Sequence, residues 1–279
     1  MHWKMNQQRA WVMLAVCALL ALLPVGCSKK SSSGTTSSET PSNQGGESKG
    51  RKPRWRTDQD FDVLVKADGA NLKFISRGMH NFADAWREML PPAALCDGNG
   101  KPLLSWRVAL LPYLEQVSLY NMFKLDEPWD SENNKKLIPY MPKIYLLPGS
   151  GDEKDGFTHY RVFVAPANAQ GNHPIFTRPS GPTGGALQNR FKINTILDGT
   201  SNTILVAESE DPVIWTKPED LDYDDKKPLP KLGYFWKDAT NVAFADGSYR
   251  TISRKVKETS LRLAITADDG MPLPNDFWD

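Results

Sequence analysis

The spacing of apolar residues changes once along this chain, and the change restricts the fold to helices followed by strands. In residues 71–88 the apolar positions recur at intervals of three and four, which places them on one face of a helix. Asp68-Gly69 and Pro91-Pro92 flank this stretch and predict its start and end. After Pro148 apolar and polar residues alternate, as in a strand. The order predicts an α+β domain rather than a repeated βαβ unit.

The later segments give this domain its predicted elements. Ser105 is a predicted N-cap, and Pro112 divides the helical stretch that follows it into two short helices. Asp246-Gly247 lies between two β-branched and apolar runs and predicts a tight hairpin. The remaining predictions are a short helix over residues 130–137, strands over 160–164 and 203–208, hairpin strands over 241–244 and 249–253, and a closing helix over 259–267.

The N-terminus has the pattern of an export signal. Residues 11–23 are apolar and uncharged, which is too short for a stable membrane span and typical of a signal peptide. The segment that ends in Val25-Gly26-Cys27 resembles the lipobox of bacterial lipoproteins, although Pro24 stands where a leucine is usual. We expect residues 1–26 to be removed and Cys27 to carry the lipid. An ordinary secretory signal and a membrane-spanning anchor are the alternatives.

The segment after Cys27 is predicted to be a tether. Residues 28–50 contain eight Ser, three Thr and four Gly, and no large apolar residue. Such a composition cannot bury enough surface to offset the entropy of ordering. We therefore expect a disordered tether over residues 27–58 and a single α+β domain over 59–279. The basic residues near Trp55 are interpreted as a solvated end of the tether, with contact to anionic lipid headgroups as the alternative.

Charge and cysteine content exclude several classes of protein. Lys plus Arg (34) nearly equals Asp plus Glu (33), which argues against nucleic acid as a partner. Cys96 is the only cysteine after Cys27, so we expect no internal disulfide and a buried, unreactive thiol. The chain has no phosphate-binding loop, zinc-binding helix motif or nucleophile elbow, and we expect no cofactor, no metal and no enzymatic activity.

Two groups of carboxylates remain as candidates for chemistry. The Asp220-x-Asp222-x-Asp224 run begins like a calcium loop, but Asp225 stands where such a loop requires glycine. An acidic surface turn is the favoured interpretation. Glu208, with Asp198 nearby in the sequence, is kept as an alternative acid–base pair.

Several segments together carry a family resemblance. They occur in a fixed order at residues 71–73, 78–82, 91–92, 103–115, 124–131, 198–203 and 241–248. These segments resemble the planctomycete domain-of-unknown-function family 1559, also called the prepilin-type processing-associated His-x9-Asp-Gly family. The likeness extends from about residue 60 to about residue 269.

The resemblance implies a pilin- or pseudopilin-like head, in which an N-terminal helix packs on an antiparallel sheet with additional short helices and long loops. This chain departs from the family in having a lipoprotein-type N-terminus and Trp236 where the signature histidine is expected. A structural role is therefore expected for the matching motif residues, which are Asp198, Gly199, Asn202, Asp246 and Gly247.

These observations lead to one functional expectation and one alternative. We expect an envelope lipoprotein anchored to the bilayer through Cys27, in either the inner or the outer membrane. Its non-catalytic head is expected to act in binding or assembly at the cell surface, with another envelope protein or a cell-surface component as partner. The alternative is a solute-binding or hydrolytic lipoprotein with a site near the loop at 166–185.

Overall fold

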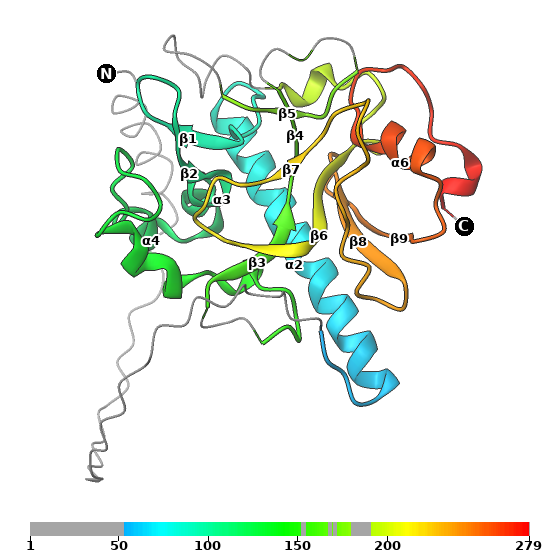
Figure 1. The fold of residues 1–279 in the computed structure, drawn as a ribbon, viewed down its shortest axis with the longest axis horizontal. Helices are drawn as coiled ribbons and strands as arrows, with labels where there is room; N and C mark the ends of the chain where they lie inside the picture. Colours follow the sequence, from blue (N-terminus) through cyan, green and yellow to red (C-terminus); the bar gives the residue numbers. More distant parts are fainter. Residues whose placement is uncertain (1–52, 152–154, 167–168, 170–171, 180–190, 279) are drawn as a thin grey trace, which may run out of the picture. The chain divides into compact units, whose positions relative to one another are not determined.

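The computed structural model describes residues 53–151, 155–166, 169, 172–179 and 191–278 (Figure 1). The predicted signal peptide, Cys27 and most of the predicted tether lie outside these residues. Within the described residues, no helix has the length and apolar character that a membrane span requires.

The longest element is helix α2, Asp58–Ala85, which is 28 residues long and therefore about 42 Å in length. Its N-cap is Thr57, whose side chain accepts a hydrogen bond from the Asp60 backbone N–H at 3.1 Å. The prediction of a start near Asn71 was wrong. Asp68 and Gly69 are buried within the helix, and the Tyr249 ring lies 2.3 Å from where a Cβ on Gly69 would project.

The end of α2 also differs from the prediction. The helix ends at Ala85, with Trp86 as its C-cap, and Arg87 and Glu88 have positive φ values of 56° and 67°. The helix therefore cannot extend to Glu88. At the other end, Trp55 contacts Phe61 and Trp236, with ring centroids 5.0 and 6.5 Å apart. The last residues of the predicted tether thus pack on the head.

Helix α2 lies across one face of a four-stranded antiparallel sheet (Figure 1). The strand order is β3-β6-β8-β9, and α2 contacts β6, β8 and β9. Gly247, at φ 85°, forms the turn between β8 and β9, as the Asp-Gly signal predicted. The expected α+β fold, with an N-terminal helix on an antiparallel sheet, is confirmed. The strands are β3 Phe157–Arg161, β6 Ile204–Ile214, β8 Ala239–Phe244 and β9 Tyr249–Ser253.

Two smaller sheets complete the strand content of the described residues. Strands β4 (Phe163–Ala165), β5 (Phe176–Thr177) and β7 (Leu221–Asp222) form a parallel sheet in the order β5-β4-β7. The predicted strand at 160–164 is divided at Val162, because its N–H donates to the Asp220 carboxylate at 3.1 Å instead of to a neighbouring strand. Strands β1 (Ala94–Cys96) and β2 (Pro102–Ser105) form a separate pair.

Short helices connect these sheets. Ser105 caps α3 as predicted, and its hydroxyl accepts from the Arg107 N–H at 3.3 Å. The helix predicted at 130–137 is a 3-10 segment shifted toward the C-terminus, with Pro139 inside it. The short helices are α3 Trp106–Ala109, η1 Leu111–Leu114, α4 Val117–Tyr120, η2 Asn134–Tyr140, η3 Lys143–Tyr145, η4 Ile193–Thr195, α6 Glu258–Ile265 and η5 Asn275–Phe277.

Helix α6 shares one apolar core with three strands of the large sheet. Leu261, Ala264 and Ile265 of α6 belong to the same buried cluster as residues of β6, β8 and β9. Leu221 and Tyr223, in and next to β7, belong to it as well. This shared core connects the parallel sheet to the antiparallel one, and the cavity described below lies at their junction.

Candidate functional site

Two carboxylic acids are buried together where α2 meets the sheet. Asp68 of α2 and Glu208 of β6 are both fully inaccessible to solvent. The Tyr160 hydroxyl donates to Asp68 Oδ1 at 2.5 Å, and the Asn241 side-chain amide donates to Asp68 Oδ2 at 2.6 Å. Tyr160 lies directly opposite Glu208 in the β3–β6 pairing. Four separate elements therefore contribute to one polar cluster.

Glu208 is held by three donors of its own. Trp236 Nε1 donates to Glu208 Oε1 at 2.9 Å, while the Thr240 hydroxyl and the Asn241 N–H donate to Oε2 at 3.0 and 2.8 Å. Trp236 stands at the position where the resemblance expects histidine. In this chain the indole N–H at that position is a hydrogen-bond donor to a buried carboxyl group.

Burial raises the pKa of both acids. It raises the pKa of Asp68 from 3.8 to about 6, although hydrogen bonds from Tyr160 and Asn241 oppose the shift. Burial and then the nearby charge of Asp68 raise the pKa of Glu208 well above its usual value of 4.5. Each of the two carboxyl groups is among the causes that shift the pKa of the other. Two adjacent acids in an apolar environment cannot both ionise at low cost, so the pair retains a proton.

This cluster stabilises the fold and has no access to a substrate, because its members are buried and its carboxyl oxygens are hydrogen-bonded within the protein. The hypothesis that Glu208 pairs with Asp198 was wrong. Asp198 instead accepts hydrogen bonds from the backbone N–H groups of Asp269 and Gly270, at 3.2 and 2.5 Å. The partner of Glu208 is Asp68, which the sequence pattern predicts at the start of a helix.

The family-motif residues lie in turns. The Asn202 side-chain amide donates to the Asp198 carbonyl oxygen at 2.8 Å, and Gly199 between them has φ 89°. The Asp246 carboxylate accepts from the Ser248 N–H at 2.8 Å, next to Gly247. These contacts are local. They fix the turn that precedes β6 and the turn between β8 and β9.

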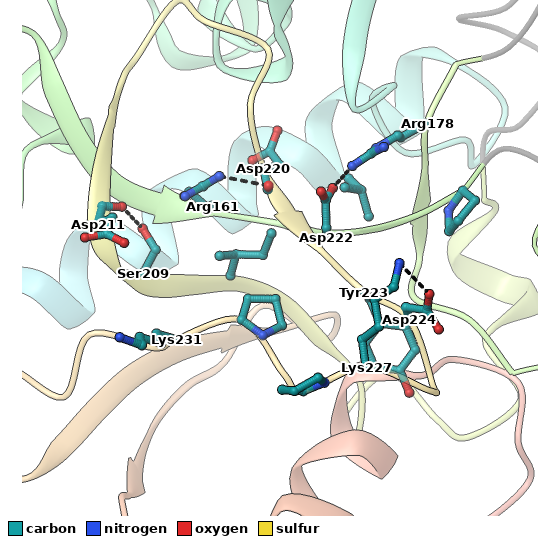
Figure 2. Close-up of a pocket in the computed structure, with 15 residues that line it drawn as sticks. Arg161, Arg178, Ser209, Asp211, Asp220, Asp222, Tyr223, Asp224, Lys227 and Lys231 are labelled. Carbon is teal, nitrogen blue, oxygen red and sulfur yellow. Dashed lines mark hydrogen bonds and ion pairs between the residues drawn. The ribbon is translucent and has the colours of Figure 1, made fainter.

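An open cavity of about 500 Å³ lies at the junction of the two sheets (Figure 2). Strands β3, β4, β6 and β7 contribute to it, together with the segment that follows β7. Its lining combines cations, carboxylates and apolar side chains: Arg161, Val164, Pro166, Arg178, Ser209, Asp211, Asp220, Leu221, Asp222, Tyr223, Asp224, Lys227, Pro228, Pro230 and Lys231.

A buried ion pair supports the cavity wall. Arg107 and Asp220 are joined at 3.2 Å, with side chains 0% and 4% exposed. Asp220 Oδ1 also accepts from Trp106 Nε1 and the Val162 N–H, each at 3.1 Å. Because an unpaired buried charge is costly, these contacts fix the segment that enters β7.

The interpretation of residues 220–224 as an acidic surface turn was therefore wrong for Asp220. The other two carboxylates of the run pair with cations: Asp222 with Arg178, and Asp224 with Lys227 at 3.0 Å (Figure 2). Within the described residues, no group of three or more His, Cys, Asp or Glu side chains is placed to hold a metal ion.

Burial shifts the pKa values of Cys96 and His159 in the directions that make a thiol and an imidazole less reactive. The Cys96 thiol is half-buried rather than buried, and burial together with the charge of Asp97 raises its pKa to about 12. Burial lowers the pKa of His159 to about 4. The Ser209 carbonyl oxygen accepts from His159 Nδ1 at 2.8 Å, which makes Nε2 the unprotonated nitrogen.

Asp68, Arg107 and Arg161 are functional-site residues that the sequence patterns did not identify as such. For Asp68 a signal was present, because it lies four residues before Leu72 and thus on the apolar stripe of α2. An acid on a buried stripe requires a polar partner elsewhere in the fold. Arg107 and Arg161 occur in apolar runs. Their positions in the sequence do not indicate which distant residues they contact.

The fold and these sites define a class of protein: an α+β head with a buried acid cluster and an open, charged cavity. A match to a family model identifies the family of this chain. The chain belongs to the family described as "Protein of unknown function (DUF1559)", whose model matches residues 69–231, more than half of the chain. The whole cavity lining falls within the match, whereas Trp236 and Asp246 lie beyond it. No curated protein and no solved structure matches this chain.

Proposed function

We propose that this chain is a membrane-anchored lipoprotein of the cell envelope, with a non-catalytic head that binds another envelope protein or a cell-surface component. The observation that carries the proposal is the separation of acid–base groups from the open cavity. Asp68 and Glu208, two acids whose pKa values burial raises, are closed within the fold. The cavity has binding groups instead.

The hydroxyl group of Ser209 supports a binding role for the cavity. It lies within hydrogen-bond distance of the carbonyl oxygens of His159 and Asp211, at 3.0 and 2.7 Å. The imidazole of His159 contacts the Ser209 carbonyl oxygen and not its hydroxyl. Within the described part of the chain, the Ser209 hydroxyl is therefore not hydrogen-bonded to the base that a serine nucleophile requires.

The lipid anchor gives the first test. Replacing Cys27 by serine is expected to abolish incorporation of radiolabelled palmitate, because the modified thiol is lost. Cys17→Ser is the matched control, since that cysteine lies in the predicted signal peptide and the variant should still be labelled. Labelling of the Cys27→Ser protein at the wild-type level would contradict the anchor.

Partner binding by the head gives the second test. Full-length tagged protein is purified from detergent-solubilised native envelopes, and the material bound to it is identified by mass spectrometry. We expect a stoichiometric envelope component, which should be absent when the bait is truncated after residue 59. If both baits recover the same components, or if neither recovers any, the head does not have the proposed function.

A solute-binding role is the second candidate, and one observation favours it. Pro166 and Arg178 both line the cavity, and they belong to the region at 166–185 where the sequence placed the alternative site. Residues 167–168, 170–171 and 180–185 of this region lie outside the described residues. Among the described residues, the hydroxyl group of Ser209 is not paired with a base, so the arrangement at Ser209 does not itself favour the hydrolytic form of this alternative.

A further inference from the structure

The charged side chains that line the cavity differ in how closely they are paired with a group of opposite charge. Three of its carboxylates have a cation partner: Asp220 pairs with Arg107, Asp222 with Arg178, and Asp224 with Lys227. The cations Arg161 and Lys231 have weaker partners. Lys231 is 3.7 Å from Glu210, and its side chain is 80% exposed. Capacity to bind charge therefore remains at two cations, Arg161 and Lys231, and at one carboxylate, that of Asp211.

Arg161 is the more informative of the two. Its side chain is only 10% exposed, and its Nη2 donates to the Asp220 carbonyl oxygen at 2.8 Å. The nearest carboxylate, on Glu219, is 3.8 Å away, beyond hydrogen-bond distance. The buried Nε atom has no hydrogen-bond partner. A guanidinium group this well buried normally has its donors satisfied, so Arg161 lacks an acceptor.

The apolar part of the lining indicates the size and nature of the occupant. Val164 and Leu221 are buried side chains in the wall, and Pro166, Pro228 and Pro230 contribute further apolar surface. A volume of about 500 Å³ falls in the range of small-molecule sites. The cavity thus offers apolar contact to a carbon skeleton beside a buried guanidinium.

We propose that this cavity binds a small organic anion, with the carboxylate or phosphate oxygens of the ligand accepting hydrogen bonds from Arg161 and facing Lys231 (Figure 2). Arginine binds both of these groups through its planar fork of donors. Asp211, whose carboxylate has no ion-pair partner among the described residues, disfavours a highly charged anion and can accept an amine of the ligand. The inference goes beyond the proposed function, because it assigns the cavity a small-molecule ligand in addition to the proposed envelope partner.

Calorimetric titration of the full-length protein in non-ionic detergent tests this inference. The probes are succinate, glutamate and inorganic phosphate, each at neutral pH and low salt. We expect saturable binding of at least one probe with a Kd below about 1 mM. Binding of succinate or glutamate identifies a carboxylate ligand, and binding of phosphate alone identifies a phosphate ligand. Absence of saturable binding for all three overturns the inference.

Two substitutions locate the binding site. Arg161→Gln should raise the Kd at least about tenfold, because it removes the buried donor group. Lys231→Gln should raise it about threefold, since the lysine is exposed. Lys255→Gln, another exposed lysine outside the cavity lining, is the control. If folded Arg161→Gln binds like the wild type, the site is wrong. If that variant does not fold, equal Kd values for the two lysine variants overturn the proposal.

This titration fails independently of the tests of the proposed function. Absence of anion binding would leave palmitate labelling and the capture of an envelope partner unchanged. Loss of labelling or of a partner would in turn leave the cavity and its titration unaffected.

Discussion

Replacing Glu208 by alanine is expected to lower the free energy of unfolding by about 3–5 kcal/mol. The substitution removes the acceptor for Trp236 Nε1, the Thr240 hydroxyl and the Asn241 N–H, all of which remain buried. It also leaves a cavity between α2 and the sheet. Little charge repulsion is relieved, because the pair formed with Asp68 already holds a proton.

Urea unfolding followed by circular dichroism measures this loss. Glu210→Ala is the matched control, since Glu210 lies two residues further along β6 with an exposed side chain, and its loss should change stability by less than about 0.5 kcal/mol. Trp236→Phe removes one donor and should cost about 1–2 kcal/mol. The double variant Glu208→Ala/Trp236→Phe should be less destabilised than the sum of the single variants. Equal stabilities for the Glu208→Ala and Glu210→Ala proteins would contradict the role given to this cluster.

The helix α2 shows both the strength and the limit of sequence reasoning. Its apolar stripe was correctly predicted, because a period of three and four is a local property of the chain. Its start was misplaced because Asp68-Gly69 resembles a helix start signal. In the fold, Gly69 leaves space for the Tyr249 ring, and Asp68 interacts with Glu208. The residue types at positions 68 and 69 are therefore explained by contacts with residues far along the chain.

The hairpin at Asp246-Gly247 and the Ser105 cap were predictable for the same reason, since both depend on a few adjacent residues. The cavity was not. Arg161 and Lys231 are separated by many residues, and only the junction of two sheets brings them to one cavity. The break at Val162 that separates those sheets results from a hydrogen bond to the distant Asp220. No periodicity in a single sequence encodes such a contact.

The acid pair also predicts how stability depends on pH. Asp68 has a pKa of about 6 in the folded protein and an ordinary value of 3.8, so between these values the folded state binds a proton that the unfolded state has released. The free energy of unfolding therefore falls as pH rises from about 4 to about 6. A pKa difference of about two units corresponds to about 3 kcal/mol. Glu208, whose pKa is also raised, extends this decrease to higher pH.

His159 acts in the opposite direction over nearly the same range. Burial lowers the pKa of His159 from 6.5 to about 4. Between these two pH values the unfolded state binds a proton that the folded state does not, so the contribution of His159 to the free energy of unfolding increases as pH rises. The pH dependence of the wild type alone would combine the two effects. A comparison with Asp68→Asn separates them, because the contribution of His159 is common to both proteins.

The measurement is the free energy of unfolding of wild type and Asp68→Asn at a series of pH values from about 4 to about 7. The wild type should lose about 3 kcal/mol relative to the variant across this range, with the decrease centred between the ordinary and the raised pKa of Asp68. The absolute stability of the variant does not affect the test, since only the difference in slope is compared. Parallel curves would show that Asp68 has the same pKa in the folded and the unfolded protein, which contradicts the raised value on which this prediction rests.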